Sequence, residues 1–380
     1  MTCFDRDTDS ARLWAHFGKG RNVLMLAPRR IGKTVLLNRL REESETRGFR
    51  AIVLDVQGFR EEKAFFQQMC AVIQEELGFG ASVLATFTDK LRQALKGSDA
   101  AAGDWRQLLL HTDWRDFARH LLSHLEHDKE GKPWLVLLDE IPIFVLALLE
   151  SHGMERVQDF LYTLRQLRQA YPNVRWLFTG SIGMDTIARR HGIEGALNDL
   201  EAYSLKPFDD ETATRFLAHV AAANGRQMAP TAARQIIARL GWLSPYYLEK
   251  IAEEASQQTA GGQAIEAQIA DRAVEAMLDL DKRTYWSTWR EHLDRNFPDP
   301  QQTHLFTVLA TIARSPQGSA SHDTLLGELN RGESVSVSQL RAYLDTLEAD
   351  GYLVACEPAE HGYRFRMGLL RDWWRRYVVG

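Results

Sequence analysis

The sequence predicts an α/β fold with a parallel sheet covered by helices on both faces, followed by a helical segment and a small C-terminal domain. Three observations support this fold class. Short apolar strands alternate with helical patterns through the first half of the chain, as parallel sheets require. A glycine-containing loop at 27–34 stands between the apolar strand Asn22–Leu26 and a helical pattern. A second apolar strand, 133–138, ends in Asp139 and Glu140.

The loop 27–34 matches the phosphate-binding pattern G-x-x-x-x-G-K-[ST], with alanine in place of the first glycine. In such a loop the backbone N–H groups surround phosphate, and the following helix adds the positive end of its dipole. We expect Lys33 to reach the β- and γ-phosphates and the Thr34 hydroxyl to bind Mg²⁺. The residues expected to contact the nucleotide here are Ala27, Pro28, Arg29, Arg30, Ile31, Gly32, Lys33, Thr34 and Val35.

The apolar strand that ends in two acids is typical of a strand buried on both faces of a parallel sheet. Asp139 stands at its carboxyl end, where α/β sheets place their ligand chemistry. We therefore expect Asp139 to hold Mg²⁺, through water. The next residue, Glu140, is then placed to orient or deprotonate the water that attacks the γ-phosphate.

A third strand, 174–179, leads into Gly180 and Ser181. This arrangement resembles that of AAA+ and related ATPases, in which a polar residue at the tip of the strand beside the Asp139 strand senses the γ-phosphate. Ser181 is the candidate for this role, and Thr179 is the alternative.

Together these residues resemble the bacterial and archaeal P-loop ATPases of the AAA+/STAND group. One branch shares the Pro-Arg-Arg-x-Gly-Lys-Thr loop at 28–34, the Leu-Asp-Glu strand end at 138–140 and the Thr-Gly-Ser strand end at 179–181. The resemblance implies a P-loop NTPase fold that binds ATP and Mg²⁺ and hydrolyses ATP, slowly or with stimulation by a partner. It also implies a helical lid, in which the stretch 241–248 is similar to a motif whose proline, here Pro245, lies near the nucleotide.

The sequence leaves open what the arginines near the expected nucleotide site do. Arg29 and Arg30, inside the loop, can stabilise phosphate charge, contact a neighbouring subunit or pair with acids. Arg189 and Arg190 follow the third strand and are candidates for an arginine finger by position only, a solvated basic helix end being an equal alternative.

The expected domains are a P-loop ATPase domain at 1–208, a helical lid at 209–282 and a winged helix at 283–380. Helical patterns at 305–313, 323–329 and 337–349 precede strand patterns at 351–356 and 362–366, which is the order of a winged helix-turn-helix. Residues 283–380 hold 11 Lys and Arg against 12 Asp and Glu. Because phosphate neutralisation supplies most non-specific DNA affinity, double-stranded DNA and a protein partner remain equal expectations for this domain.

Composition sets broad limits on function. The 380 residues are 45% hydrophobic and 26% charged, with a net charge of −5, which is ordinary for a soluble globular protein. An apolar run of the ~20 residues needed to cross a bilayer is missing, so no membrane partner is expected. The three cysteines, Cys3, Cys70 and Cys356, suit neither a disulfide framework nor a zinc cluster. With no secretory signal visible, we expect a cytoplasmic protein. A homo-oligomer is compatible with the sequence.

The leading hypothesis is a nucleotide-driven switch, in which ATP and Mg²⁺ join the sheet to the lid and hydrolysis releases them. A second hypothesis is a DNA-binding regulator or loader whose assembly is controlled by nucleotide. A third is a protein-interaction scaffold that binds nucleotide with negligible turnover. The presence of Glu140 disfavours the third, because a site without catalysis has no need of that base.

Overall fold

The computed structural model describes residues 3–76, 112–127, 130–180, 184–332, 334–357 and 362–379. It divides the chain into two units. The N-terminal unit comprises Met1–Ala27 and Lys33–Leu205, and the C-terminal unit comprises Pro28–Gly32 and Lys206–Gly380. The central part of the phosphate-binding loop is thus grouped with the C-terminal unit, although both ends of the loop belong to the N-terminal unit. The predicted division into three domains at 208 and 282 stays a prediction.

The N-terminal unit is built on a parallel sheet with the strand order β2-β3-β4-β1-β5. Its strands are β1 (Asn22–Leu26), β2 (Arg50–Asp55), β3 (Trp134–Asp139), β4 (Val174–Gly180) and β5 (Leu200–Ser204). Strand β4 lies beside both β3 and β1, as expected for the strand that carries the sensor residue. Because all these strands run in one direction, the residues that follow β1, β3 and β4 meet at a single edge of the sheet.

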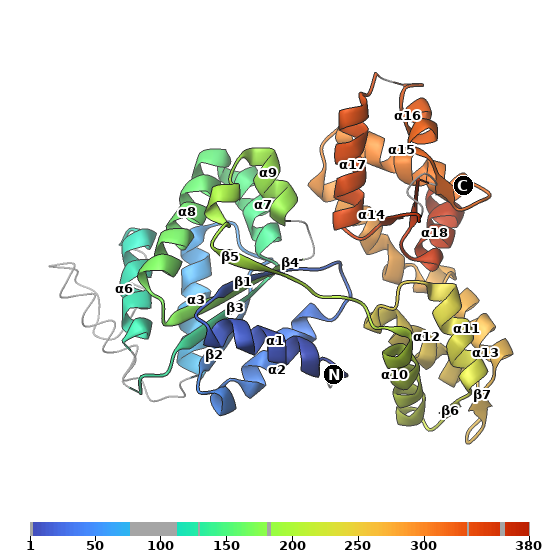
Figure 1. Cartoon of the computed structure of the whole chain (residues 1–380), viewed down its shortest axis with the longest axis horizontal. Coiled ribbons are helices and arrows are strands. Elements are labelled where there is room, and N and C mark those ends of the chain that lie inside the picture. Colours follow the sequence, from blue (N-terminus) through green and yellow to red (C-terminus); the bar gives the residue numbers. More distant parts are fainter. Residues whose placement is uncertain are drawn as a thin grey trace. The chain divides into compact units, whose positions relative to one another are not determined.

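Helices cover both faces of this sheet (Figure 1), which confirms the predicted α/β architecture. Helices α1 and α2 lie on one face, and α3, α6 and α8 lie on the other. The helices of the unit are α1 (Asp7–Gly18), α2 (Lys33–Glu43), α3 (Glu62–Glu76), α6 (Trp114–Glu126), α7 (Ile141–His152), α8 (Met154–Ala170) and α9 (Met184–His191), with short 3-10 turns η1 (Glu45–Arg47) and η2 (Glu194–Ala196). The sequence also indicates a less regular insertion at 78–112, of which only Thr112 is among the described residues.

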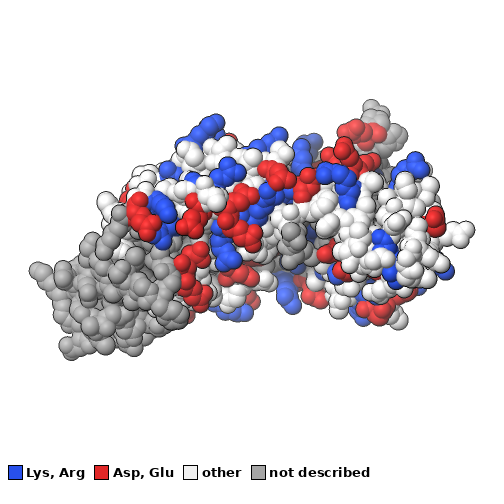
Figure 2. Space-filling model, turned by 90° about the horizontal axis from the view of Figure 1, so that it is seen from below, with Lys and Arg blue, Asp and Glu red and all other residues white. Residues whose placement is uncertain are grey.

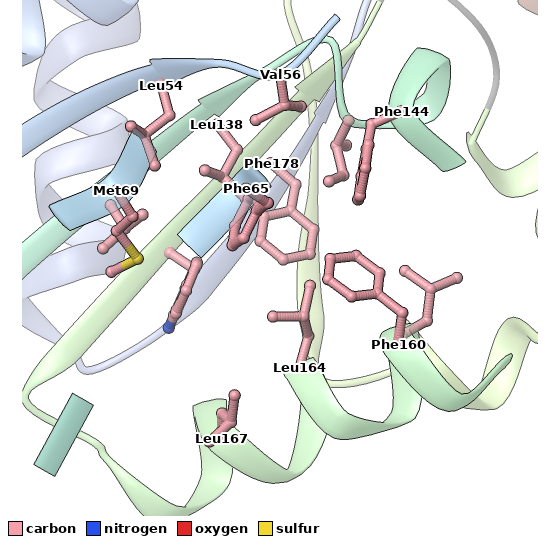
Figure 3. Close-up of a cluster of buried hydrophobic side chains, with 14 of the residues drawn as sticks. Leu54, Val56, Phe65, Met69, Leu138, Phe144, Phe160, Leu164, Leu167 and Phe178 are labelled. Atoms are coloured by element: carbon pink, nitrogen blue, oxygen red, sulfur yellow. The ribbon is translucent and has the colours of Figure 1, made fainter. Parts of the chain in front are cut away.

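The main hydrophobic core lies between the sheet and the helices α3, α6, α7 and α8. Strand β3 is buried at every position, as its unbroken apolar sequence predicts. Figure 3 shows Phe65, Phe144, Phe160 and Phe178 side by side in this core. All four rings are fully buried, and each such side chain contributes roughly 1.5–3 kcal/mol through burial. This packing fixes the sheet edge that carries the polar residues.

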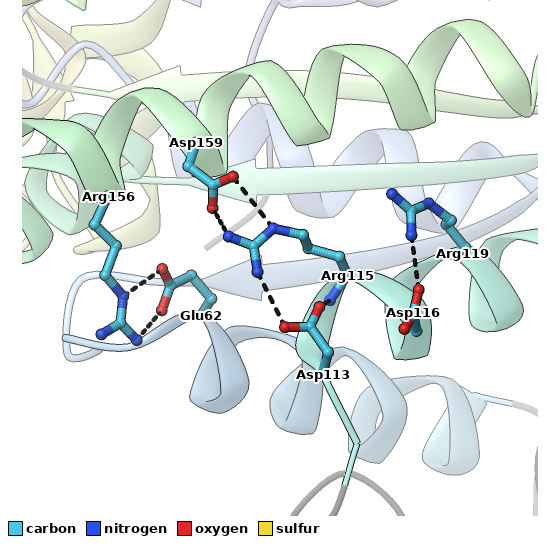
Figure 4. Close-up of polar contacts among 7 residues, drawn as sticks. All are labelled: Glu62, Asp113, Arg115, Asp116, Arg119, Arg156 and Asp159. Atoms are coloured by element: carbon cyan, nitrogen blue, oxygen red, sulfur yellow. Dashed lines mark hydrogen bonds and ion pairs between the residues drawn. The ribbon is translucent and has the colours of Figure 1, made fainter. Parts of the chain in front are cut away.

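Ion pairs join the outer helices of the same face (Figure 4). The guanidinium of Arg156 on α8 donates two hydrogen bonds to the carboxylate of Glu62 on α3, at 2.8 and 2.6 Å. The Glu62 side chain is fully buried. Arg115 on α6 contacts Asp159 on α8 in the same way. Burying a carboxylate is costly unless it is paired. The contact with Arg156 therefore holds α3 and α8 together at this point.

The first half of the C-terminal unit is helical, as expected for 209–280. Its elements are α10 (Asp210–Ala223), α11 (Pro230–Leu240), α12 (Pro245–Gln257), α13 (Ala267–Ala276) and η3 (Leu280–Lys282), with a short parallel pair formed by β6 (Gln227–Met228) and β7 (Ala264–Ile265). Helix α14 (Thr284–Asn296) follows and buries Trp286, Trp289 and His292.

The last part, which we call the C-terminal segment, spans 301–379. It contains α15 (Gln301–Arg314), β8 (Ser319–Ala320), α16 (His322–Leu329), α17 (Val337–Ala349), β9 (Leu353–Ala355), β10 (Tyr363–Phe365) and α18 (Gly368–Trp374), which continues as a π-helical turn, η5 (Arg375–Val379). Strand β10 pairs antiparallel with β8 and β9. The predicted order of three helices and a hairpin is therefore observed. Among the described residues, no helix is both long enough and apolar enough to cross a membrane.

Candidate functional site

The phosphate-binding loop lies where the sequence predicts it, between the end of β1 and the start of α2. Gly32 has a φ of +95°, a conformation that side chains other than glycine rarely adopt. Arg30 has a φ of +65°, which a non-glycine residue holds only under constraint from its surroundings. Ala27 is not among the described residues with positive φ. The alanine at the first glycine position therefore causes no backbone strain.

Lys33, the first residue of α2, is 6% exposed. Its ammonium group donates a hydrogen bond to the backbone carbonyl of Ala27 at 2.9 Å, across the base of the loop. A buried ammonium with backbone oxygens close by is held ready for an anionic partner, since phosphate oxygens are stronger acceptors for a cation than a carbonyl. Ile31 is fully buried and Val35 is half-buried, so these two residues support the loop by packing.

Asp139 is the centre of a polar cluster at the edge of the sheet. Its carboxylate accepts hydrogen bonds from the Thr34 hydroxyl at 2.6 Å, the Thr179 hydroxyl at 2.6 Å and the Glu140 backbone N–H at 3.1 Å. Asp139 is 5% exposed and Thr179 is fully buried. These three donors supply hydrogen bonds to a carboxylate that is otherwise shielded from water. The structure thus brings together Thr34 and Asp139, the two predicted metal ligands.

This oxygen set fits the predicted cation. Mg²⁺ prefers oxygen ligands and is usually held by one or two protein groups together with water and phosphate. The Thr34 hydroxyl and an Asp139 carboxylate oxygen lie within hydrogen-bonding distance of each other. Both can therefore face one ion. Among the described residues, no group of three or more His, Cys, Asp or Glu side chains could hold a metal by itself.

Glu140 follows Asp139 directly and has a φ of +58°. Its backbone carbonyl accepts hydrogen bonds from Ile143 and Phe144 as α7 begins. Gly180, at the end of β4, makes room for this turn. A Cβ added at Gly180 would lie 2.3 Å from Cδ of Pro142, the second residue of α7. Glycine at this position therefore allows α7 to approach the strand tip, and it sets the place of Glu140.

The sensor position is resolved only in part. Thr179, the alternative candidate, donates directly to Asp139. Ser181, the preferred candidate, lies outside the described residues, and so do the side chains of Arg189 and Arg190 on α9. Their predicted roles stay predictions.

Arg30 is enclosed by residues of the C-terminal unit. Its guanidinium donates to the Thr288 hydroxyl at 3.1 Å, to the Tyr247 hydroxyl at 3.3 Å and to the backbone carbonyl of Tyr285. It also lies over the ring of Tyr246, 4.2 Å from the centroid, in a cation–π contact. Burial raises the pKa of Tyr247 to about 12. The hydroxyl therefore stays protonated and donates to the carbonyl of Tyr285 at 3.2 Å.

Arg29 has a different and sparser environment. One terminal nitrogen lies 3.4 Å from Nδ1 of His292. Nε2 of His292 is 3.0 Å from a carboxylate oxygen of Asp350, and both side chains are at most 3% exposed. Among the described residues, Nε of Arg29 is buried without a hydrogen-bond partner. Beside it, a Cβ added at Gly351 would lie 2.7 Å from Cβ of Pro28, so the loop backbone approaches this turn closely.

Pro245 is the first residue of α12. The preceding residue, Ser244, is fully buried. Its hydroxyl donates a hydrogen bond of 2.6 Å to the backbone carbonyl of Arg30. The motif at 241–248 therefore reaches the loop through Ser244. Sequence reasoning did not identify Ser244, Tyr246, Thr288 or His292 as loop contacts, although the first two stand next to the predicted Pro245.

Comparison with known proteins defines the fold. No protein-family model and no curated protein sequence matches the chain. The Walker-type ATPase of Pyrococcus abyssi superposes with a TM-score of 0.67 at 17% identity, covering 98% of this chain and 96% of its own. The ORC2 protein of Aeropyrum pernix, in ADPNP and ADP complexes, superposes with a TM-score of 0.61 at 14% identity, covering 99% of this chain and 93% of its own. At these identities the likeness establishes a shared P-loop NTPase fold.

Proposed function

We propose that this protein is an ATP-binding, Mg²⁺-dependent ATPase that acts as a nucleotide-driven switch. The observation that carries the proposal is the convergence of Lys33, Thr34, Asp139 and Thr179 at the carboxyl edge of one parallel sheet. These residues come from three strand ends that are far apart in the sequence. The fold it shares with a Walker-type ATPase and with a protein solved in ADPNP and ADP complexes supports the same conclusion.

The chemistry follows from the side chains at that edge. Lys33 exchanges its bond to the Ala27 carbonyl for the β- and γ-phosphate oxygens. Thr34 and Asp139 would hold Mg²⁺, which would neutralise the negative charge that develops on the phosphates. Glu140 orients or deprotonates the attacking water. A hydroxyl at the tip of β4, from Ser181 or Thr179, contacts the γ-phosphate and distinguishes the triphosphate from the diphosphate.

A switch also needs an output, and we assign this role to the C-terminal segment. Its order of helices and strands supports the assignment, because it suits a winged helix. Its partner is double-stranded DNA or a protein. Ser338, Gln339 and Arg341 are exposed on α17, but so is Asp345. Basic and acidic side chains are also interspersed over the face shown in Figure 2. An AAA+/STAND assignment, self-association and a cytoplasmic location belong to the same proposal.

Nucleotide binding by the full chain tests the proposal. We expect calorimetry to detect binding of Mg·AMPPNP, a non-hydrolysable ATP analogue, and we expect Lys33→Ala to abolish it. Lys19→Ala is the matched control, because Lys19 is exposed at the end of α1 in the same unit. Absence of binding to the wild-type protein, or equal binding by the Lys33→Ala variant, would refute the assignment.

A further inference from the structure

The two arginines of the phosphate-binding loop have unequal surroundings. The guanidinium of Arg30 has hydrogen-bond acceptors at both terminal nitrogens and an aromatic ring beneath it. The backbone carbonyl of the same residue is held by Ser244. Its positive φ is therefore maintained by contacts on the side chain and on the backbone. Arg30 is thus a fixed point of the loop.

The donor and acceptor roles of the two ring nitrogens of His292 can be assigned from their neighbours. Nδ1 faces a terminal nitrogen of Arg29 at 3.4 Å and the side-chain nitrogen of Asn296 at 2.9 Å. The same Asn296 nitrogen donates to the backbone carbonyl of His292 at 2.7 Å, which settles the orientation of the amide. Both neighbours of Nδ1 can only donate. Nδ1 is therefore the acceptor, and Nε2–H donates to Asp350.

It follows that Arg29 places its positive charge against the lone pair on Nδ1 of His292. A hydrogen bond of 3.4 Å is long for a charged donor, whose bonds to anions are usually about 2.7–2.9 Å. Nε of the same guanidinium is buried without a partner among the described residues. An arginine in this state gains more from a phosphate anion than from His292, because arginine pairs with phosphate through charge-assisted, often bidentate bonds.

We propose that Arg30 is a positioning residue that anchors the phosphate-binding loop in the C-terminal unit, and that Arg29 is a releasable contact. Nucleoside triphosphate at the loop withdraws Arg29 from His292 and leaves the His292–Asp350 pair without its contact to the loop. The ligand thereby changes helix α14, which carries His292, and the end of α17, which is followed by Asp350. A ligand can shift such an equilibrium only through its different affinity for the two states, and the exchange of partners by Arg29 supplies that difference. This inference rests on the proposed nucleotide binding.

Backbone hydrogen exchange of the full chain, read in α14, tests both parts. Without nucleotide, we expect Arg30→Lys to speed exchange in α14 about tenfold, since lysine cannot reproduce the forked hydrogen bonds of arginine. Thr288→Val removes one of the same contacts from the other side, and we expect a smaller change of the same sign. Arg226→Lys is the matched control, because Arg226 donates to the backbone carbonyl of Thr259 at 2.8 Å, away from the loop.

With saturating Mg·AMPPNP, we expect exchange around His292 to rise several-fold in the wild-type protein and to stay unchanged in His292→Leu. A positioning role also predicts that Arg30→Lys weakens Mg·AMPPNP binding about tenfold, because the ligand must then order the loop, whereas Arg226→Lys binds normally. Circular dichroism melting confirms that each variant is folded.

The possible failures are distinguishable. If Mg·AMPPNP does not bind the wild-type chain, the proposed function fails, while the comparison of Arg30→Lys with Arg226→Lys without nucleotide still tests the anchor. If Mg·AMPPNP binds and exchange in α14 does not respond, the releasable contact is overturned. If Arg30→Lys and Arg226→Lys exchange alike and bind alike, the anchor is overturned.

Discussion

Thr179→Val is the most informative single substitution in the polar cluster. The two side chains have nearly the same shape, so the fully buried site keeps its packing, and the change removes only a hydroxyl. That hydroxyl donates to Asp139 at 2.6 Å, and without it the buried carboxylate loses one of three donors. Hydrogen bonds to charged groups contribute about 1.5–3 kcal/mol to the free energy of unfolding. For a domain of about 150–250 residues this corresponds to a fall in melting temperature of roughly 3–12 °C.

Urea unfolding followed by circular dichroism and by tryptophan fluorescence measures this loss. Thr46→Val is the control, because the Thr46 hydroxyl also donates to an oxygen, the backbone carbonyl of Glu43 at 2.7 Å, but in an exposed position. We expect the control to change the free energy of unfolding by less than about 0.5 kcal/mol. If Thr179→Val were as stable as the wild-type protein, or if the two variants lost equal stability, Thr179 would not be a significant support of Asp139.

Two further predictions concern the turn at Glu140 and the carboxylate of Glu43 at the end of α2. Gly180→Ala should lower the free energy of unfolding by about 1–3 kcal/mol, because the new methyl overlaps Pro142. It should also slow ATP turnover, because it displaces Glu140. Chemical unfolding measures the first effect and a turnover assay measures the second. Although desolvation opposes it, hydrogen bonds from Ser10, Arg39 and Trp14 lower the pKa of Glu43. The stabilisation from Glu43 is therefore present above about pH 4.3, the value of an unfolded glutamate, and is lost as the pH falls through the lowered folded value. Glu43→Gln should accordingly lower the melting temperature at pH 7 and have little effect near pH 2.

The fold could be predicted because its signals are local. The strand, loop and helix around Lys33 are consecutive in the chain, and the uninterrupted apolar sequence of β3 indicates burial on both faces. The choice between Thr179 and Ser181 as the sensor stays open, because the two residues flank Gly180 in the sequence and Ser181 lies outside the described residues. The pairing of Leu138 with Phe178 sets Asp139 beside Thr179, and such register cannot be deduced from composition.

The surroundings of the loop arginines could not be predicted at all. Thr288 is 258 residues away from Arg30 in the sequence, and nothing in either local pattern links them. Nothing in the local pattern at Tyr246 and Tyr247 indicates a contact with the loop either. Only the folded chain shows that these residues surround a guanidinium from the phosphate-binding loop. The last helix shows a smaller difference. The sequence at 370–377 resembles the terminal helix of the AAA+/STAND ATPases, whereas the observed helix begins at Gly368 and changes to a π-helical turn at Arg375.

We propose above all that the protein is an ATPase switch in which Glu140 activates the water that hydrolyses ATP. The ATP turnover of the purified chain tests this proposal most directly. Turnover should be measured with Mg²⁺, with and without double-stranded DNA, beside Glu140→Gln and the control Glu155→Gln, whose side chain is exposed on α8. We predict that turnover is lost in Glu140→Gln and kept in Glu155→Gln. Stimulation of turnover by DNA would indicate that the C-terminal segment binds the duplex. Turnover that does not respond to DNA would indicate a protein partner. Equal turnover by Glu140→Gln and the wild-type protein, or no turnover by either, would contradict the role given to Glu140.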